Sequence, residues 1–149
     1  MRAVIQRVSQ ASVRIGGKTC GKIGRGLVIL LGIRRGDNEN DLRWLADKIV
    51  NLRIFGDQDG KMNLSAADID GEVLIISQFT LYGDCRKGRR PGFSAAAAPD
   101  IAEPLYNKFI QEIENRRLRV ASGTFQAEMS VELTNDGPVT LLLDSEKTF

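Results

Sequence analysis

The chain has 149 residues, of which 42% are hydrophobic and 27% charged, with a formal net charge of +2 and no histidine. This length predicts a single domain, residues 1–149, with enough apolar surface for its own core, and the mixed charges argue against disorder. The small net charge excludes polyanion binding through overall charge alone, and the lack of histidine excludes Ser-His-Asp and Cys-His catalytic groupings.

The first third of the chain carries strand and turn signals. Residues 2–15 alternate apolar and polar side chains, which predicts one long or broken strand. Gly16-Gly17 predicts a turn, and residues 18–23 a short arm after it. Residues 27–33 form a continuous apolar run, which is typical of a strand that is buried on both faces.

Two main helices are predicted. Asp37 or Asn38 is placed to cap a helix that runs to about Asn51, with leucine and isoleucine at helical spacing on one face. A second helix is expected to begin between Pro99 and Pro104, because proline fits the first turn of a helix better than its interior.

The remaining strands come from the second half of the chain. Residues 72–79 are strongly β-prone. Residues 125–133 and 139–143 predict two more strands, joined by a hairpin at Asn135–Pro138 because Asp-Gly between apolar runs is a common hairpin signal. This order predicts an α+β fold with a mixed, mostly antiparallel β-sheet and two main helices on one side.

The two cysteines, Cys20 and Cys85, form neither a CxxC pair nor a metal-ligand spacing. We therefore expect two free thiols, buried or partly buried, in a reducing compartment, and no metal site. No apolar run is long enough to cross a bilayer, and residues 1–15 lack the apolar stretch of a signal peptide. The expected location is cytoplasmic, without membrane contact.

Two clusters of basic residues are candidates for contacts with nucleic acid. The first cluster lies in a Gly/Pro-rich loop and contains Arg86, Lys87, Arg89 and Arg90. The second lies near the end of the second predicted helix and contains Arg116, Arg117 and Arg119. Each cluster is either a local phosphate-binding patch or simply a solvated loop and cations at a helix C-terminus.

Hydroxyl groups are the remaining candidate nucleophiles. Ser77 and Thr80 could attack a substrate, but an unactivated hydroxyl is weak and no lysine is adjacent in sequence. Alternatively, the protein supplies only geometry and backbone N–H groups, and the substrate brings its own reactivity. An aminoacyl ester on a ribose fits this second case, because it is activated and carries a neighbouring hydroxyl.

Four segments resemble the D-aminoacyl-tRNA deacylase (D-tyrosyl-tRNA deacylase) family, and the resemblance runs through the whole domain. They are Met1-Arg2-Ala3-Val4-Ile5-Gln6-Arg7-Val8, Ser77-Gln78-Phe79-Thr80, Lys87-Gly88-x-Arg90-Pro91 and the corner from Asn135 to Thr140. The resemblance implies a homodimeric hydrolase that cleaves the ester between a D-amino acid and tRNA without a metal or organic cofactor. Such an enzyme proofreads chirality for translation.

The resemblance also implies roles for individual residues. The catalytic segment is Ser77, Gln78, Phe79 and Thr80. Gly137 and Pro138 match a cis Gly-Pro unit that enters the partner's pocket and selects chirality. Arg7 matches an arginine that fixes this unit, and Phe125 and Met129 match two positions near the terminal adenosine. The loop that would contact tRNA contains Arg86, Lys87, Arg89 and Arg90.

Two stretches depart from the family pattern. Gln126 stands where the family often has glycine, in a Phe-Gly-Ala-x-Met stretch near the adenosine contacts. In the basic loop, Arg89 and Gly92 replace the asparagine and serine of a Gly-Asn-Arg-Pro-Ser-Phe stretch. The first departure bears on adenosine contacts and the second on tRNA affinity.

Rigid backbone placed where an L side chain would go rejects L-aminoacyl groups, and glycine at that backbone allows close approach. Because a glycyl group has no side chain to reject, we predict that glycyl-tRNA, including glycine mischarged on tRNA(Ala), is also hydrolysed. From base rates alone, a trans bond in a plain hairpin is the alternative for Gly137-Pro138.

Three further alternatives stay open. The chain could be a non-catalytic nucleic-acid-binding dimer, or a hydrolase of a small metabolite with Thr80 as nucleophile. Within the deacylase interpretation, either Thr80 attacks to form an acyl-enzyme, or water attacks with help from the tRNA 2′-hydroxyl and backbone donors near Phe79. The lack of a base favours water.

Overall fold

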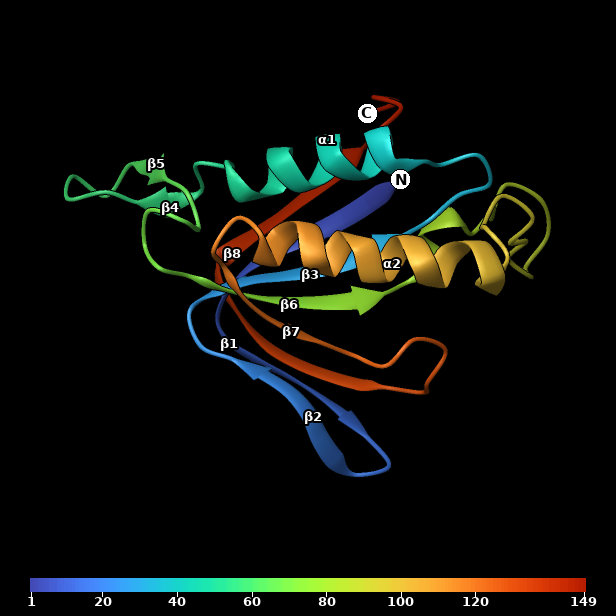
Figure 1. The fold of residues 1–149 in the computed structure, drawn as a ribbon, viewed down its shortest axis with the longest axis horizontal. Helices are drawn as coiled ribbons and strands as arrows, with labels where there is room; N and C mark the ends of the chain where they lie inside the picture. The colour runs from blue at the N-terminus through green and yellow to red at the C-terminus, as the bar shows by residue number, and fades with distance from the viewer.

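The computed structural model describes all 149 residues and has an α+β fold (Figure 1). The main sheet contains β1 (Arg2–Ile15), β2 (Lys18–Ile23), β3 (Gly26–Gly32), β6 (Glu72–Ser77), β7 (Arg119–Ser122) and β8 (Ser130–Asp144). A separate small hairpin contains β4 (Phe55–Gly56) and β5 (Met62–Leu64). The helices are α1 (Glu39–Val50), α2 (Pro99–Glu114) and the 3-10 turn η1 (Phe79–Tyr82).

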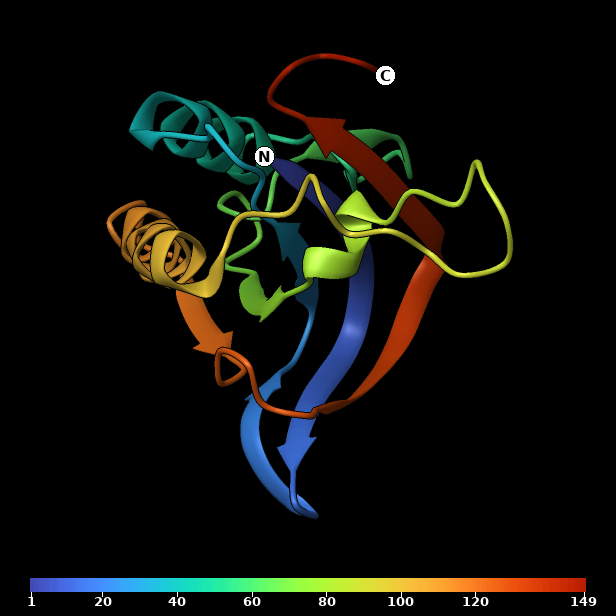
Figure 2. The same ribbon diagram turned by 90° about the vertical axis from the view of Figure 1, so that its right-hand side faces the viewer.

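The long strand β1 organises the sheet. It pairs with β2 and β3 along one edge and with β8 along the other, and all three pairings are antiparallel. The order continues from β3 to β6 and β7 through parallel pairings. The sheet is therefore mixed, as predicted, and it curls into a nearly barrel-like shape (Figure 2).

Two apolar cores lie on opposite faces of this sheet. The larger one packs beneath α1 and α2, which both cover one face, and includes Ile5, Ile29, Ile75 and Phe109. The smaller one fills the concave face and is built on buried strand residues: Val8, Ala11, Val13, Ile23, Val28, Leu74 and Ile76. Because β3 and β6 contribute to both cores, the central residues of each strand are apolar on both faces of the sheet.

Both helices begin where the sequence predicts. Asn38 caps α1: its side chain accepts a hydrogen bond from the Asn40 N–H (2.8 Å), and the Asp41 carboxylate accepts one from the Asn38 N–H (3.0 Å). Pro99 occupies the first turn of α2, where its missing N–H costs nothing. No helix is long and apolar enough to cross a membrane.

The predicted hairpin at Asn135–Pro138 is wrong. Residues 130–144 form one continuous strand, β8, and residues 125–129 are a loop, not a strand. Between the pairs Val8–Asn135 and Gln6–Thr140, β1 advances two residues while β8 advances five, so the corner is a large bulge in β8. The sequence prediction failed because a turn signal inside a strand reads the same as a turn between strands.

Two smaller predictions also need correction. Cys20 and Cys85 are free but exposed, because Cys20 lies on the edge strand β2 and Cys85 lies in the basic loop. The short strand β7 was not predicted. It follows α2 directly, and Arg119, expected at the helix end, is its first residue.

Candidate functional site

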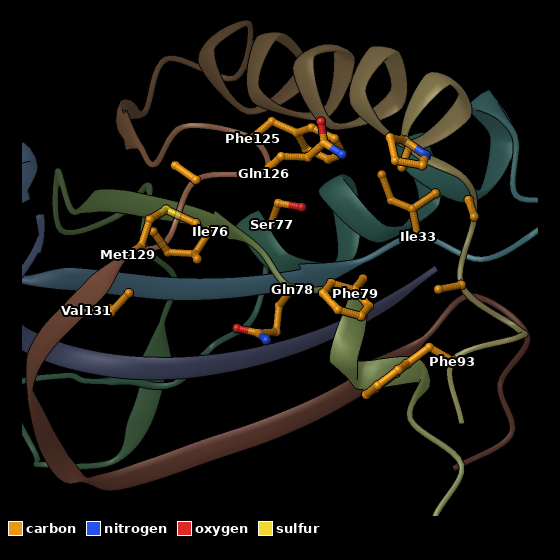
Figure 3. Close-up of a pocket in the computed structure, with 15 residues that line it drawn as sticks. Ile33, Ile76, Ser77, Gln78, Phe79, Phe93, Phe125, Gln126, Met129 and Val131 are labelled. Atoms are coloured by element: carbon orange, nitrogen blue, oxygen red, sulfur yellow. The ribbon is translucent and has the colours of Figure 1, made fainter. Parts of the chain in front are cut away.

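A cavity of about 650 Å³ opens where β6 ends, between η1, the start of α2 and the loop from β7 to β8 (Figure 3). Its walls are mostly apolar, with only three polar side chains among them, those of Ser77, Gln78 and Gln126. Phe125 and Gln126 lie on the side next to α2, and Gln78, Phe79 and Phe93 lie on the opposite side (Figure 3). A mainly apolar cavity with a few polar groups is the usual form of a small-ligand site.

The Ser77–Thr80 segment forms the edge of this cavity. The Gln78 N–H donates to the Leu31 carbonyl (2.8 Å), which extends the pairing with β3 by one bond before the chain turns into η1. Gly32 permits this close turn, because a Cβ there would lie 3.1 Å from the Gln78 carbonyl oxygen. The turn leaves the Phe79 ring 55% exposed, and the ring packs edge-on against Phe93 at 5.0 Å.

The opposite wall depends on two residues that the sequence reasoning missed, Tyr106 and Gly123. The buried Tyr106 hydroxyl donates to the Ile75 carbonyl (2.8 Å), and its ring lies 5.9 Å from that of Phe125. Burial raises the pKa of Tyr106 to about 12, so the phenol stays a neutral donor. Its helical spacing from Phe109 and Ile113 is the signal that could have identified it.

Gly123 determines the position of Met129. Its N–H donates to the Ile75 carbonyl (3.1 Å), which keeps the end of β7 beside the end of β6. A Cβ on Gly123 would lie 2.3 Å from the Met129 sulfur, so only glycine lets Met129 fold into the cavity wall.

The corner from Asn135 to Thr140 lies on the surface, and the Gly137–Pro138 peptide bond is cis. Asn135 braces it twice, accepting from the Val139 N–H (2.7 Å) and donating to the Val139 carbonyl (3.0 Å). Arg7, directly opposite on β1, donates to the Asp136 carbonyl (2.7 Å) and to the Ile54 carbonyl. These bonds hold an exposed stretch of backbone in one geometry.

The structure brings together some of the predicted site residues and leaves others apart. Ser77, Gln78, Phe79, Phe125 and Met129 line the cavity. Four residues do not line it: Thr80, Arg7, Gly137 and Pro138. Within one chain, the corner and the cavity are therefore separate features.

The basic loop from Gly83 to Phe93 is closed at its base by two hydrogen bonds between Asp84 and Gly92, of 2.7 and 3.0 Å. Arg86 binds the Asp84 carboxylate (2.7 Å), which lowers the pKa of Asp84 and raises that of Arg86. The other loop cations are Lys87, Arg89 and Arg90, and none of them forms an ion pair within the chain. In the second cluster, Arg116 pairs with Glu112 and Arg119 with Glu72, so the loop offers more free positive charge.

Comparison with known proteins identifies the family. Residues 4–144 match the family described as D-Tyr-tRNA(Tyr) deacylase. The chain is 62% identical to the D-aminoacyl-tRNA deacylase of Thermosipho africanus and 60% identical to that of Desulforamulus reducens, and each match covers 100% of both chains.

Two solved structures share the fold. One, titled c-Myc DNA Unwinding Element Binding Protein, has a TM-score of 0.91 and 42% identity, over 97% of this chain and 98% of its own. The other, a probable eukaryotic D-amino acid tRNA deacylase, has a TM-score of 0.80 and 21% identity, over 95% of this chain and 97% of its own, which supports the fold alone. From the full-length matches, the chain belongs to the D-aminoacyl-tRNA deacylase family, whose members are hydrolases that act on the ester bond of aminoacyl-tRNA.

Proposed function

We propose that this single domain removes D-amino acids from tRNA in the cytoplasm as a homodimer, in which the corner of one subunit completes the cavity of the other. The observation that carries the proposal is the braced, exposed corner. Arg7 and Asn135 fix its backbone, yet it lies outside the cavity of its own chain. Rigid exposed backbone of this kind is suited to contact a second molecule.

Exposed apolar side chains support the dimer. Phe79 at the cavity edge is 55% exposed, and Leu142 on β8, which pairs with Val4 of β1, is 57% exposed. A second copy that covered them would bury apolar surface now in contact with water. The same packing would bring a corner near a cavity edge.

The corner would select chirality through main-chain atoms. Gly137 has no side chain, so its backbone can approach the α-carbon of the substrate closely, and an L side chain would collide with it. A glycyl group offers no side chain to exclude, so glycyl-tRNA, including glycine mischarged on tRNA(Ala), is a second substrate. Protection of glycyl-tRNA equal to that of L-tyrosyl-tRNA at high enzyme concentration would contradict this selection by exclusion.

The attacking group is water. The only hydrogen-bond partner of the Thr80 hydroxyl is the Gln78 side-chain amide, which donates to it and cannot accept its proton. The neighbouring 2′-hydroxyl of the terminal ribose assists water instead, while backbone N–H groups near Phe79 and Thr80 stabilise the oxyanion. A trapped acyl ester on Thr80 would overturn this mechanism.

Matched D- and L-tyrosyl-tRNA test the reaction. We expect selective loss of the D ester, and equal rates for both would refute chiral selection.

An experiment that mixes two inactive variants tests the shared site. Gly137→Ala disables the corner, and Phe79→Ala disables the cavity edge. With random pairing, about a quarter of sites in an equal mixture combine an intact corner with an intact cavity. Activity should therefore return on mixing, and its absence would contradict a cross-subunit site.

A second candidate function is nucleic-acid binding without catalysis. It is favoured by the similar structure titled as a DNA unwinding element binding protein and by the unpaired loop cations of this chain. Salt-dependent binding of uncharged tRNA or duplex DNA, without loss of any aminoacyl ester, would support it over the first candidate.

A further inference from the structure

A tight turn presents Gln126 to the cavity. Residues 124–127 form this turn, closed by a hydrogen bond from the Ala127 N–H to the Thr124 carbonyl (3.2 Å), with Phe125 and Gln126 as its central residues. The φ angle of Gln126 is 62°, in the left-handed region that glycine adopts without strain and residues with side chains rarely do. A side chain is therefore kept here at a conformational cost, and a function for that side chain would explain it.

Gln126 carries the one lining amide of the cavity without a partner in the chain, and the Ser77 hydroxyl is a second free polar group on the cavity wall. Gln78, the other lining amide, donates to the Thr80 hydroxyl. The Gln126 side chain makes no hydrogen bond within the chain, so both its donor and its acceptor are available to a ligand. Around it stand flat apolar surfaces, including the neighbouring Phe125 and, across the cavity, Phe79 and Phe93 (Figure 3).

We infer that Gln126 hydrogen-bonds the terminal adenine of the tRNA, as a specificity-determining residue for the reaction. A side-chain amide matches the N6 donor and N7 acceptor of adenine, and aromatic side chains stack on unpaired bases. A cavity of about 650 Å³ has room for the base. The aminoacyl side chain is the weaker candidate partner, because it varies between substrates and most such side chains lack a paired donor and acceptor. This inference rests on the proposed function only for the identity of the substrate.

The test compares D-tyrosyl-tRNA ending in adenosine with the same tRNA ending in 7-deazaadenosine, which lacks the N7 acceptor. Gln126→Met keeps the length of the side chain without its hydrogen bonds, and Gln126→Gly also relieves the backbone. Both variants should raise KM about tenfold with little change in kcat. The 7-deaza substitution should raise the wild-type KM about fivefold and leave the KM of both variants unchanged.

Two results would overturn the inference: wild-type KM in both variants, or a 7-deaza effect that is equally large in the variants. A loss that follows the amino acid, appearing with D-tyrosyl but not D-phenylalanyl esters, would do the same. Binding of the trinucleotide CCA, with adenosine or 7-deazaadenosine, should show the same pattern in Kd, and this readout does not depend on hydrolysis. Gln126→Gly should melt no lower than Gln126→Met, which separates lost recognition from lost folding.

Discussion

Replacing Gly137 with alanine is the sharpest test of the corner. The new Cβ would lie 2.7 Å from the Val139 Cγ2 and 3.0 Å from both the Val139 nitrogen and an Arg7 guanidinium nitrogen. Val139 cannot easily move, because its side chain is buried and Asn135 holds its N–H. The φ of 142° at Gly137 adds strain for any residue with a side chain.

Overpacking and backbone strain together cost about 2 kcal/mol, which lowers the melting temperature by about 4–8 °C in a chain of this size. A shift of the corner by a fraction of an ångström to 1 Å should reduce the rate of D-tyrosyl-tRNA hydrolysis about 100-fold. Gly24→Ala is the control, since nothing lies within 4 Å of a Cβ there and its φ is not positive. Gly137→Ala with wild-type hydrolysis and intact rejection of L-tyrosyl-tRNA would refute the role of the corner.

Three further changes test other parts of the site. Thr80→Ala should retain most of the deacylation rate in single-turnover assays if water is the nucleophile, and a loss of about 1,000-fold would identify Thr80 as the attacking group. Gly123→Ala should displace the flexible Met129 side chain and raise KM several-fold, while the melting temperature falls by less than about 3 °C; an unchanged KM would exclude Met129 from substrate binding. The loop cations to neutralise are Lys87, Arg89 and Arg90, and their loss should reduce the slope of log K against log salt concentration for tRNA binding by about two to three units. Arg119→Gln removes an ion-paired cation and should change this slope little. Equal effects of the two changes would contradict the loop as the tRNA contact.

The parts of the fold that follow local rules could be predicted from the sequence. The capping residue of α1, the proline at the start of α2 and the apolar run of β3 each act through neighbours a few residues away. The family motifs likewise indicated Ser77, Phe79, Phe125 and Met129, and all four line the cavity.

What could not be predicted depends on contacts between distant segments. The bulge in β8 exists because β1 pairs on both sides of it, and no local pattern reports that pairing. Gly123 and Tyr106 matter only because β7 ends beside β6, and the sequence did not predict β7. The exposure of both cysteines likewise follows from their places on an edge strand and a projecting loop.

The bulge also changes which face of the sheet β8 serves. Before it, Val131 and Leu133 pack into the smaller core. From its last residue onward, Val139, Leu141 and Leu143 pack into the larger core on the opposite face. All five are odd-numbered, so a regular strand would send them to one face, and the three extra residues of the bulge reverse the alternation. The length of the corner is thus fixed by parity: losing or gaining one residue would turn the apolar side of one half of β8 toward solvent, whatever happened to catalysis.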